Sequence, residues 1–261
     1  MIPKIIHYIW LGNSPMPDEM QTCINSWRKW MPDYVIKRWD DTCIDKIDSV
    51  FVREAIAEKK WAFASDVIRL YAIKTYGGIY LDTDVMVYRS FDTLLNNHAF
   101  IGRERFEHLQ GIRLVNYLTT CCFGAEKDNE FISTCYNYYK DRHFITSFDR
   151  SLPQDLRYDI RLNSEIFCIL AQQVGYDAGL LANHRQTCED NVLTIFPSWS
   201  FDATKVQPDT YSRHLALGTW RNRPKKTYHY NYSLQYKIEW RVVALFKKIL
   251  RKMNYEVLKI D

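Results

Sequence analysis

The pattern of apolar and polar positions along this chain predicts a fold in which strands alternate with helices. Short apolar runs rich in β-branched and aromatic residues predict strands at Lys4–Trp10, Tyr34–Trp39, Ile79–Leu81, Val85–Tyr88, Ala99–Gly102, Thr119–Ala125, Val192–Phe196 and Tyr211–Leu217. Apolar residues at helical spacing predict helices at Asp18–Trp30, Lys60–Tyr76, Asn129–Tyr139 and Asn163–Val174, with shorter helices within 41–58. The polar stretch 140–162 follows neither period and predicts a surface loop. This alternation is typical of an α/β domain.

Composition narrows the class of protein. Hydrophobic residues make up 47% and aromatic residues 15% of the 261 residues, which excludes a disordered chain. The chain has an odd number of cysteines, seven, and none of them form a C-x-x-C pair. This pattern predicts that they are free thiols in a protein of a reducing compartment. The first residues enter a strand directly, without the pattern of a signal peptide. No apolar run reaches the roughly 18 residues that a membrane-spanning helix needs.

Two carboxylates, Asp82 and Asp84, follow a buried strand that begins after a Gly-Gly turn. In an extended chain, residues two apart share a face, so both side chains are predicted to point the same way. Neighbouring carboxylates repel each other, and a divalent cation such as Mg²⁺ or Mn²⁺ relieves this repulsion. An Asp-x-Asp pair by itself is also common in solvated turns, so its meaning depends on its surroundings.

The helix before this strand carries two further charged residues. Asp66 and Arg69 are three positions apart and are therefore neighbours on one helical face. Gly77 is predicted to end this helix as a left-handed cap. The opposite stripe of the helix is apolar and is predicted to face the core, through Phe63, Val67, Leu70 and Tyr71.

The string Ser-Asp-x-x-Arg, followed by Tyr-Gly-Gly-Ile-Tyr-Leu-Asp-x-Asp, resembles the signature of DXD-motif glycosyltransferases of family 32. That family includes bacterial capsular and lipopolysaccharide sugar transferases, and it is related to initiating mannosyltransferases and to the glucosylating domains of clostridial toxins. The segment Ile2–Gly12 is similar to the family's first strand. The segment His214–Trp220 is similar to the family's His-x-x-x-Gly-Ser-Trp, with Thr219 in place of serine.

The resemblance spans about residues 1–222 and implies a single GT-A-type nucleotide-sugar-binding domain with a mixed central sheet, followed by a basic segment at 223–261. It implies a retaining glycosyltransferase that moves a hexosyl unit from a UDP- or GDP-linked sugar. The acceptor would be a saccharide or a lipid-linked oligosaccharide in surface polysaccharide synthesis.

The resemblance also implies the residues of the site. Mn²⁺ or Mg²⁺ would be held by Asp82, Asp84 and His214, and the catalytic residues would be Asp66, Arg69, Asp82 and Asp84. Donor-binding residues would be Trp10, Ser65, Asp66, Arg69, Tyr80, Asp82, Asn163, Thr219 and Trp220.

Trp10 ends the first strand, where open parallel sheets present their carboxyl edge to ligands. Its indole is suited to stacking on a uracil or guanine base; without the resemblance, a core position would be the simpler interpretation. His7 lies on the other face of this strand and is predicted to be a core histidine.

Positive charge is concentrated near the C-terminus. Between Arg213 and Lys252 there are eleven Lys and Arg residues and one acid, a net charge of +10, while the remainder of the chain carries −6. Drawn as a helix, residues 233–253 have an apolar stripe beside a basic face, which favours binding to an anionic membrane surface. We therefore expect a cytoplasmic protein, peripheral on the inner face of the cell membrane. The alternative is that this stripe packs on the domain; nucleic acid is a poorer partner, because no nucleic-acid-binding motif is present.

Two other classes of protein deserve comparison. Phosphohydrolases of the haloacid-dehalogenase type also use D-x-D after a strand, but they favour Thr or Val where this chain has Met86, and they place the motif near the N-terminus. A non-catalytic membrane-associated adaptor would have no use for the combined Asp-x-x-Arg, Asp-x-Asp and His-x-x-x-Gly-Thr-Trp motifs. The glycosyltransferase interpretation is therefore preferred.

Overall fold

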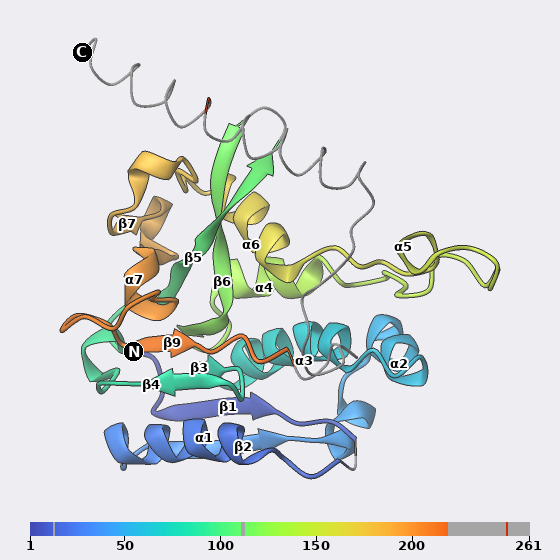
Figure 1. The fold of residues 1–261 in the computed structure, drawn as a ribbon, viewed down its shortest axis with the longest axis horizontal. Coiled ribbons are helices and arrows are strands. Elements are labelled where there is room, and N and C mark those ends of the chain that lie inside the picture. Colours follow the sequence, from blue (N-terminus) through green and yellow to red (C-terminus); the bar gives the residue numbers. More distant parts are fainter. Residues whose placement is uncertain (13, 111–112, 219–248, 250–261) are drawn as a thin grey trace, which may run out of the picture.

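The computed structural model describes residues 1–12, 14–110, 113–218 and 249 (Figure 1). Thr219, Trp220 and the predicted amphipathic helix, apart from Ile249, lie outside the described residues, as does the predicted boundary at 222. Among the described residues, no helix combines the length and the apolar character needed to cross a membrane.

A mixed sheet of seven strands forms the centre of the fold, in the order β2-β1-β3-β6-β5-β8-β7. Parallel ladders join β1 to β2 and β3 and join β5 to β8, whereas β6 runs antiparallel to both β3 and β5, and β7 runs antiparallel to β8. The strands are β1 (Ile5–Ile9), β2 (Val35–Trp39), β3 (Gly78–Leu81), β5 (Ala99–Gln110), β6 (Arg113–Ala125), β7 (Gln186–Thr187) and β8 (Thr194–Phe196). The predicted α/β class with a mixed central sheet is confirmed.

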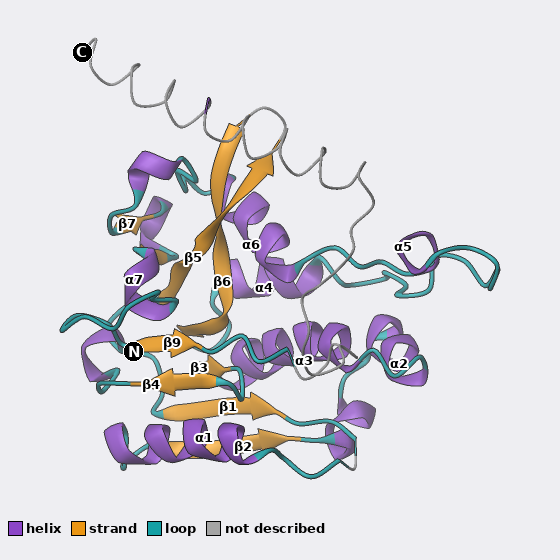
Figure 2. Cartoon of the chain, viewed as in Figure 1, coloured by secondary structure: helices purple, strands orange, loops and turns teal. Residues whose placement is uncertain are grey.

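Helices cover both faces of this sheet (Figure 2). One face packs against α2 (Val50–Ala57), α3 (Trp61–Tyr76), α4 (Glu130–Asn137) and α6 (Asn163–Gln172). The other face packs against α1 (Asp18–Trp30), α7 (Ser198–Phe201) and a small antiparallel sheet of β4 (Val85–Val87) and β9 (Ser212–His214). Side chains of β3 alternate between the two layers, with Tyr80 in the first and both Ile79 and Leu81 in the second. The remaining short elements are α5 (Gln154–Arg157) and the 3₁₀ turns Asp41–Lys46, Asp92–Leu94, Leu180–Ala182 and Glu189–Asn191.

The β5–β6 hairpin is much longer than the sequence pattern predicts. It projects away from the other strands, as Figure 1 shows, while the loop that contains α5 extends from another side of the molecule. The predicted strands ended at Gly102 and began at Thr119, because the charged residues between these positions break the apolar pattern. The backbone ladder nevertheless continues to the pair Gln110–Arg113.

Several local predictions are borne out and one needs correction. His7 is fully buried, accepts a hydrogen bond from Trp39 Nε1 at Nδ1, and lies 2.9 Å from the Gly77 carbonyl through Nε2. All seven cysteines are buried and free. Gly77 does end α3 with a positive φ of 64°, but its ψ of −171° is not that of a left-handed helical cap. Backbone with a positive φ and a ψ near 180° is essentially restricted to glycine, and at Gly77 it connects the helix to β3.

Candidate active site

The two carboxylates of the Asp-x-Asp pair follow strand β3 as predicted, but they lie in a tight turn and not in an extended segment. Strand β3 ends at Leu81, and the Asp82 carbonyl accepts a hydrogen bond from the Val85 amide at 3.0 Å, which closes a turn into β4. The turn is anchored to β6, because the Asp82 amide donates to the Cys121 carbonyl at 2.8 Å. The turn, rather than strand alternation, therefore determines where the two side chains point.

His214 reaches this turn from the far end of the chain. Because β9 pairs with β4, His214 lies opposite Val85, and its Nε2 is 3.3 Å from Asp84 Oδ1. The chain then wraps around Asp84: the Leu217 amide donates to Asp84 Oδ2 at 2.9 Å, and the Leu215 amide donates to the Asp84 carbonyl at 3.0 Å. Ala216, between these two donors, has a φ of 52°, a conformation that non-glycine residues rarely adopt outside functional or tightly held turns.

Asp82, Asp84 and His214 each offer one ligand atom, and these three atoms lie within 4.8 Å of one another. Burial opposes ionisation of Asp84, but the hydrogen bond and charge of His214 outweigh it and lower the pKa of the carboxyl group. Burial lowers the pKa of the His214 imidazole, yet the adjacent Cys121 and Asp84 side chains raise it well above its usual value. Two carboxylates and one imidazole form a ligand set that fits a divalent cation.

Arg69 links the helix α3 to the turn. Its guanidinium donates to the Thr120 carbonyl at 2.8 Å and lies 3.0 Å from Asp66 Oδ1 and 3.4 Å from Asp82 Oδ1. It also lies over the Tyr80 ring, 4.6 Å from the ring centre, while the Tyr80 hydroxyl donates to Asp82 Oδ1 at 2.6 Å. Because Arg69 is only 6% exposed, these contacts replace most of its hydration.

Asp66 and its neighbours form the far side of this cluster. Asn163, at the start of α6, points its amide Nδ2 at Asp66 Oδ1 over 3.4 Å. The Ser65 hydroxyl accepts from Arg69 Nη2 at 3.1 Å and donates to the Ala62 carbonyl at 2.6 Å. Burial raises the pKa of the Asp66 carboxyl group to about 6, although Arg69 acts in the opposite direction. A carboxylate held this far from its ordinary pKa is typical of a functional site.

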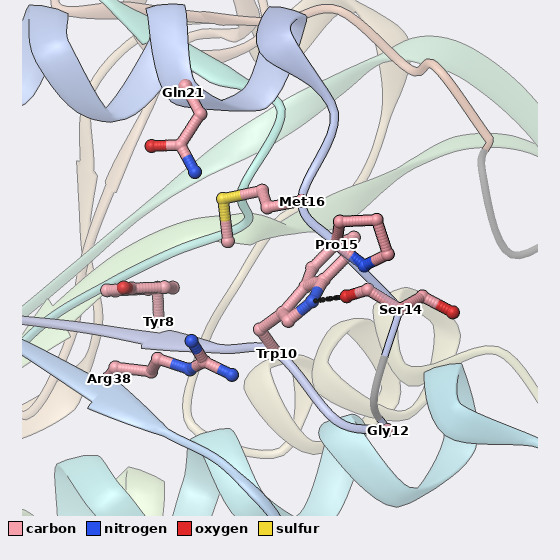
Figure 3. A pocket seen from close by; sticks show the side chains of 8 residues that line it. All are labelled: Tyr8, Trp10, Gly12, Ser14, Pro15, Met16, Gln21 and Arg38. Carbon is pink, nitrogen blue, oxygen red and sulfur yellow. Dashed lines mark hydrogen bonds between the residues drawn. The ribbon is translucent and has the colours of Figure 1, made fainter.

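Trp10 lines a pocket of about 400 Å³ at the carboxyl ends of β1 and β2 (Figure 3). Its indole Nε1 donates to the Ser14 carbonyl at 2.9 Å. The other side chains around the pocket supply a phenol, a guanidinium and a carboxamide from Tyr8, Arg38 and Gln21. An aromatic face beside convergent polar groups suits a planar heterocyclic ligand.

The structure thus brings most predicted site residues together in one contact network, made of Ser65, Asp66, Arg69, Tyr80, Asp82, Asp84, Asn163 and His214. Trp10 lines a separate pocket whose walls contain none of these residues. Sequence reasoning missed the Thr120 carbonyl and the Leu217 amide, which are backbone groups without any sequence signal. It also missed Tyr8, Arg38 and Gln21, because no motif marks them.

Comparisons with known proteins agree with this geometry. Residues 17–101 match the family model described as a glycosyltransferase sugar-binding region containing a DXD motif. Two relatives are inositol phosphoceramide mannosyltransferases 3 and 1 of Schizosaccharomyces pombe, 32% identical over 106 residues and 30% identical over 111 residues. The matches cover 39% and 38% of this chain but only 30% and 33% of those proteins, so the chain spans about a third of the relatives' length.

Two solved structures show partial similarity. The PaToxG glycosyltransferase has a TM-score of 0.47 at 21% identity, over 66% of this chain and 69% of that one. A glycosyltransferase involved in glycosylation of the major capsid of PBCV-1 has a TM-score of 0.31 at 11% identity, over 56% and 72%. The family match covers Asp66, Arg69, Asp82 and Asp84, so this region of the chain is similar to the sugar-binding region of glycosyltransferases that contain a DXD motif.

Proposed function

We propose that this protein is a metal-dependent, retaining glycosyltransferase that moves a hexosyl unit from a UDP- or GDP-linked sugar to a saccharide or lipid-linked acceptor. One observation carries the proposal: the buried Arg69 guanidinium joins Asp66 on α3 to Asp82 in the turn. Asp82 in turn belongs to the cluster with Asp84 and His214. A nucleotide-sugar donor needs polar groups for its sugar and a cation site for its diphosphate, and here the Asp66–Arg69 pair lies next to the Asp82, Asp84 and His214 cluster.

Asp82, Asp84 and His214 would hold the divalent cation, Mn²⁺ or Mg²⁺. When bound, the cation stabilises negative charge on the departing diphosphate. The protein's own contribution is to keep the ligands oriented: Leu217 fixes one oxygen of Asp84, and Tyr80 fixes one oxygen of Asp82. The other oxygen of Asp84, Oδ1, lies 3.3 Å from His214 Nε2, and contacts that orient metal ligands in this way raise the affinity of a site for its metal.

Asp66 and Arg69 would orient the donor sugar, with Asn163 beside them. In the transfer, the bond between the anomeric carbon and the diphosphate oxygen breaks, and the acceptor hydroxyl oxygen bonds to the same carbon. The acceptor proton passes to the departing diphosphate. For retention we favour same-face attack through a short-lived oxocarbenium-like ion pair, because no second carboxylate among the described residues stands out as a covalent nucleophile.

The Trp10 pocket would receive the nucleobase, with the indole stacking on uracil or guanine. Arg38 and Gln21 carry N–H donors, which complement the carbonyl oxygens that both bases present. Thr219 and Trp220 remain donor-binding residues by resemblance.

The acceptor side of the proposal rests on the C-terminal sequence. The net charge of +10 and the apolar stripe of residues 233–253 support attachment to the inner face of the cell membrane, beside a lipid-linked acceptor. Two relatives are named for a mannosyl transfer involving inositol phosphoceramide, a lipid, which also supports a lipid-linked acceptor. Such an enzyme would serve the synthesis of capsular polysaccharide or lipopolysaccharide.

A panel of nucleotide sugars tests the function. The purified protein is incubated with UDP-glucose, UDP-galactose, UDP-N-acetylhexosamines or GDP-mannose, with Mn²⁺, with Mg²⁺ or with excess chelator, and release of the nucleoside diphosphate is measured. We expect one donor to be hydrolysed in a metal-dependent manner, and p-nitrophenyl phosphate to be left intact. Metal-independent release, or cleavage of p-nitrophenyl phosphate, would contradict the proposal; no release from any donor would favour the adaptor.

A further inference from the structure

His214 is braced by a second pair of charged residues that no motif marks. Strand β5 reaches the candidate site with a bulge: three of its residues, Glu104 to Phe106, lie between the ladder pairs Arg103–Leu118 and Glu107–Asn116, where β6 has only Tyr117. Bulges redirect side chains and are frequent beside active sites. Here the bulge directs Arg105 toward the strand that carries His214.

Arg105 and Asp202 form a partly buried ion pair. Asp202 follows α7, and its Oδ2 accepts a hydrogen bond from the Arg105 amide at 3.0 Å, while Arg105 Nη1 lies 3.4 Å from Oδ1. The same Nη1 donates to the His214 carbonyl at 3.4 Å. The guanidinium of Arg105 also lies over the Phe106 ring, 4.9 Å from the ring centre.

The Oδ1 atom of Asp202 is unusual because it is buried and accepts no hydrogen bond from the residues that the structure describes. Burial raises the pKa of the Asp202 carboxyl group, while the Arg105 amide and guanidinium and the His214 imidazole act in the opposite direction. The side chain of Asp202 is only 5% exposed, so its charge acts mainly on protein groups nearby.

The element that carries His214 is itself tied to α7. The Ser212 hydroxyl donates to the Phe201 carbonyl at 3.1 Å, and the Tyr211 amide donates to the Ser200 carbonyl at 2.8 Å. Asp202 comes directly after these two acceptors in the chain. The helix that ends just before Asp202 is therefore hydrogen-bonded to the start of β9, whose last residue is His214.

We propose that Asp202 and Arg105 are positioning residues, which hold His214 against Asp84 and so set the affinity of the site for its divalent cation. This proposal rests on the proposed metal dependence. Partners that orient a metal-binding histidine typically change metal affinity by about 10- to 100-fold when they are lost. No direct contact between Asp202 and the cation is needed.

Mn²⁺ binding without any nucleotide tests the proposal, measured as the loss of the free-ion signal in electron paramagnetic resonance. We expect Asp202→Asn to raise the Kd for Mn²⁺ by at least about tenfold, and Arg105→Gln to raise it in the same direction. The matched control is Arg142→Gln, which breaks the partly exposed pair with Asp159 (3.6 Å) and should leave the Kd unchanged. Circular dichroism and thermal unfolding establish that each variant is folded.

A double-mutant cycle separates positioning from simple charge attraction. In the His214→Ala background, Asp202→Asn should change the Kd for Mn²⁺ by less than about twofold, because the residue that it orients is already absent. An equal loss of affinity in both backgrounds would overturn the proposal, as would an unchanged Kd for Asp202→Asn in the wild-type background. If the wild-type protein itself did not bind Mn²⁺, that result would contradict both the proposed metal site and the proposed role of Asp202 and Arg105.

Discussion

Replacing Asp66 by Asn should make the protein more stable at pH 7 while removing its activity. Asp66 lies beside Arg69, but burial dominates and raises the pKa of its carboxyl group from 3.8 to about 6. The folded protein therefore binds a proton at Asp66 more tightly than the unfolded chain does. Holding this carboxylate ionised at neutral pH destabilises the fold, which is a common property of functional groups.

The expected gain in the free energy of unfolding can be calculated from the raised pKa of Asp66. A rise from 3.8 to about 6 corresponds to about 3 kcal/mol at pH values well above 6. The side chain is 16% exposed, so water screens part of this, and we expect a gain of about 2 kcal/mol for the neutral, isosteric Asn. For a chain of this size, that gain raises Tm by about 4–8 °C.

The raised pKa of Asp66 also determines the direction in which the stability of the wild-type protein changes with pH. Between the unfolded pKa, near 4, and about 6, the folded state binds more protons, so wild-type stability falls as the pH rises through this window. The variant lacks this titration, so its advantage should be absent near pH 4 and complete near pH 7.

The assay is thermal and urea unfolding of both proteins from pH 4 to pH 7.5, without donor or metal. The control is Asp141→Asn, at an exposed loop position whose positive φ of 61° asparagine also tolerates; it should match wild type at every pH. Donor hydrolysis by Asp66→Asn should fall at least about tenfold, or roughly 1.4 kcal/mol of barrier. The reasoning would be refuted if Asp66→Asn were less stable than wild type at pH 7, or if its difference in stability from wild type were the same at pH 4 and at pH 7.

Four further outcomes are expected. Asp84→Ala should abolish metal-dependent transfer with the circular dichroism spectrum intact; full activity of this variant would contradict the metal site. Arg69→Lys should lower turnover at least about tenfold in steady-state kinetics, because an ammonium cannot reach Thr120, Asp66 and Asp82 together; wild-type turnover would make the cluster merely structural. Trp10→Ala should weaken binding of the free nucleotide by about 1–3 kcal/mol in calorimetry, and unchanged affinity would return Trp10 to a structural role. Removal of residues from 233 onward should release the protein from anionic vesicles in a sedimentation assay but preserve donor hydrolysis, and salt should weaken vesicle binding of the full chain; no binding at low salt, or unfolding on truncation, would contradict the membrane proposal.

Local sequence was sufficient for the parts of this protein that depend on near neighbours. The i, i+3 spacing put Asp66 beside Arg69, and the structure has the pair at 3.0 Å. Apolar periodicity located α1 at the predicted Asp18–Trp30 and α3 within one residue of its start. Strand alternation likewise placed His7 in the core.

Tertiary structure decided everything that depends on pairing across long stretches of chain. His214 meets Asp84 only because β9 pairs with β4, which are separated by more than a hundred residues in the sequence. The sequence pattern ends one strand at Leu81 and begins the next at Val85, but the turn between them takes its geometry from a hydrogen bond to β6, about forty residues further along the chain. Arg105 and Asp202 carry no motif at all, since a bulge and the end of a short helix bring them together.

This difference has a physical reason: secondary structure depends on interactions within a few residues, whereas the site depends on contacts between segments that are distant in the sequence. Helical and strand periods reflect sterics and side-chain burial over a few residues, so they can be recognised in the sequence alone. The ionisation of Asp66 and the pairing of Asp84 with His214 depend on which groups exclude water from the site, and those groups come from α3, α6, β4 and β9. Sequence determined which side chains were available for chemistry; burial between distant elements decided which of them meet and how their charges are held.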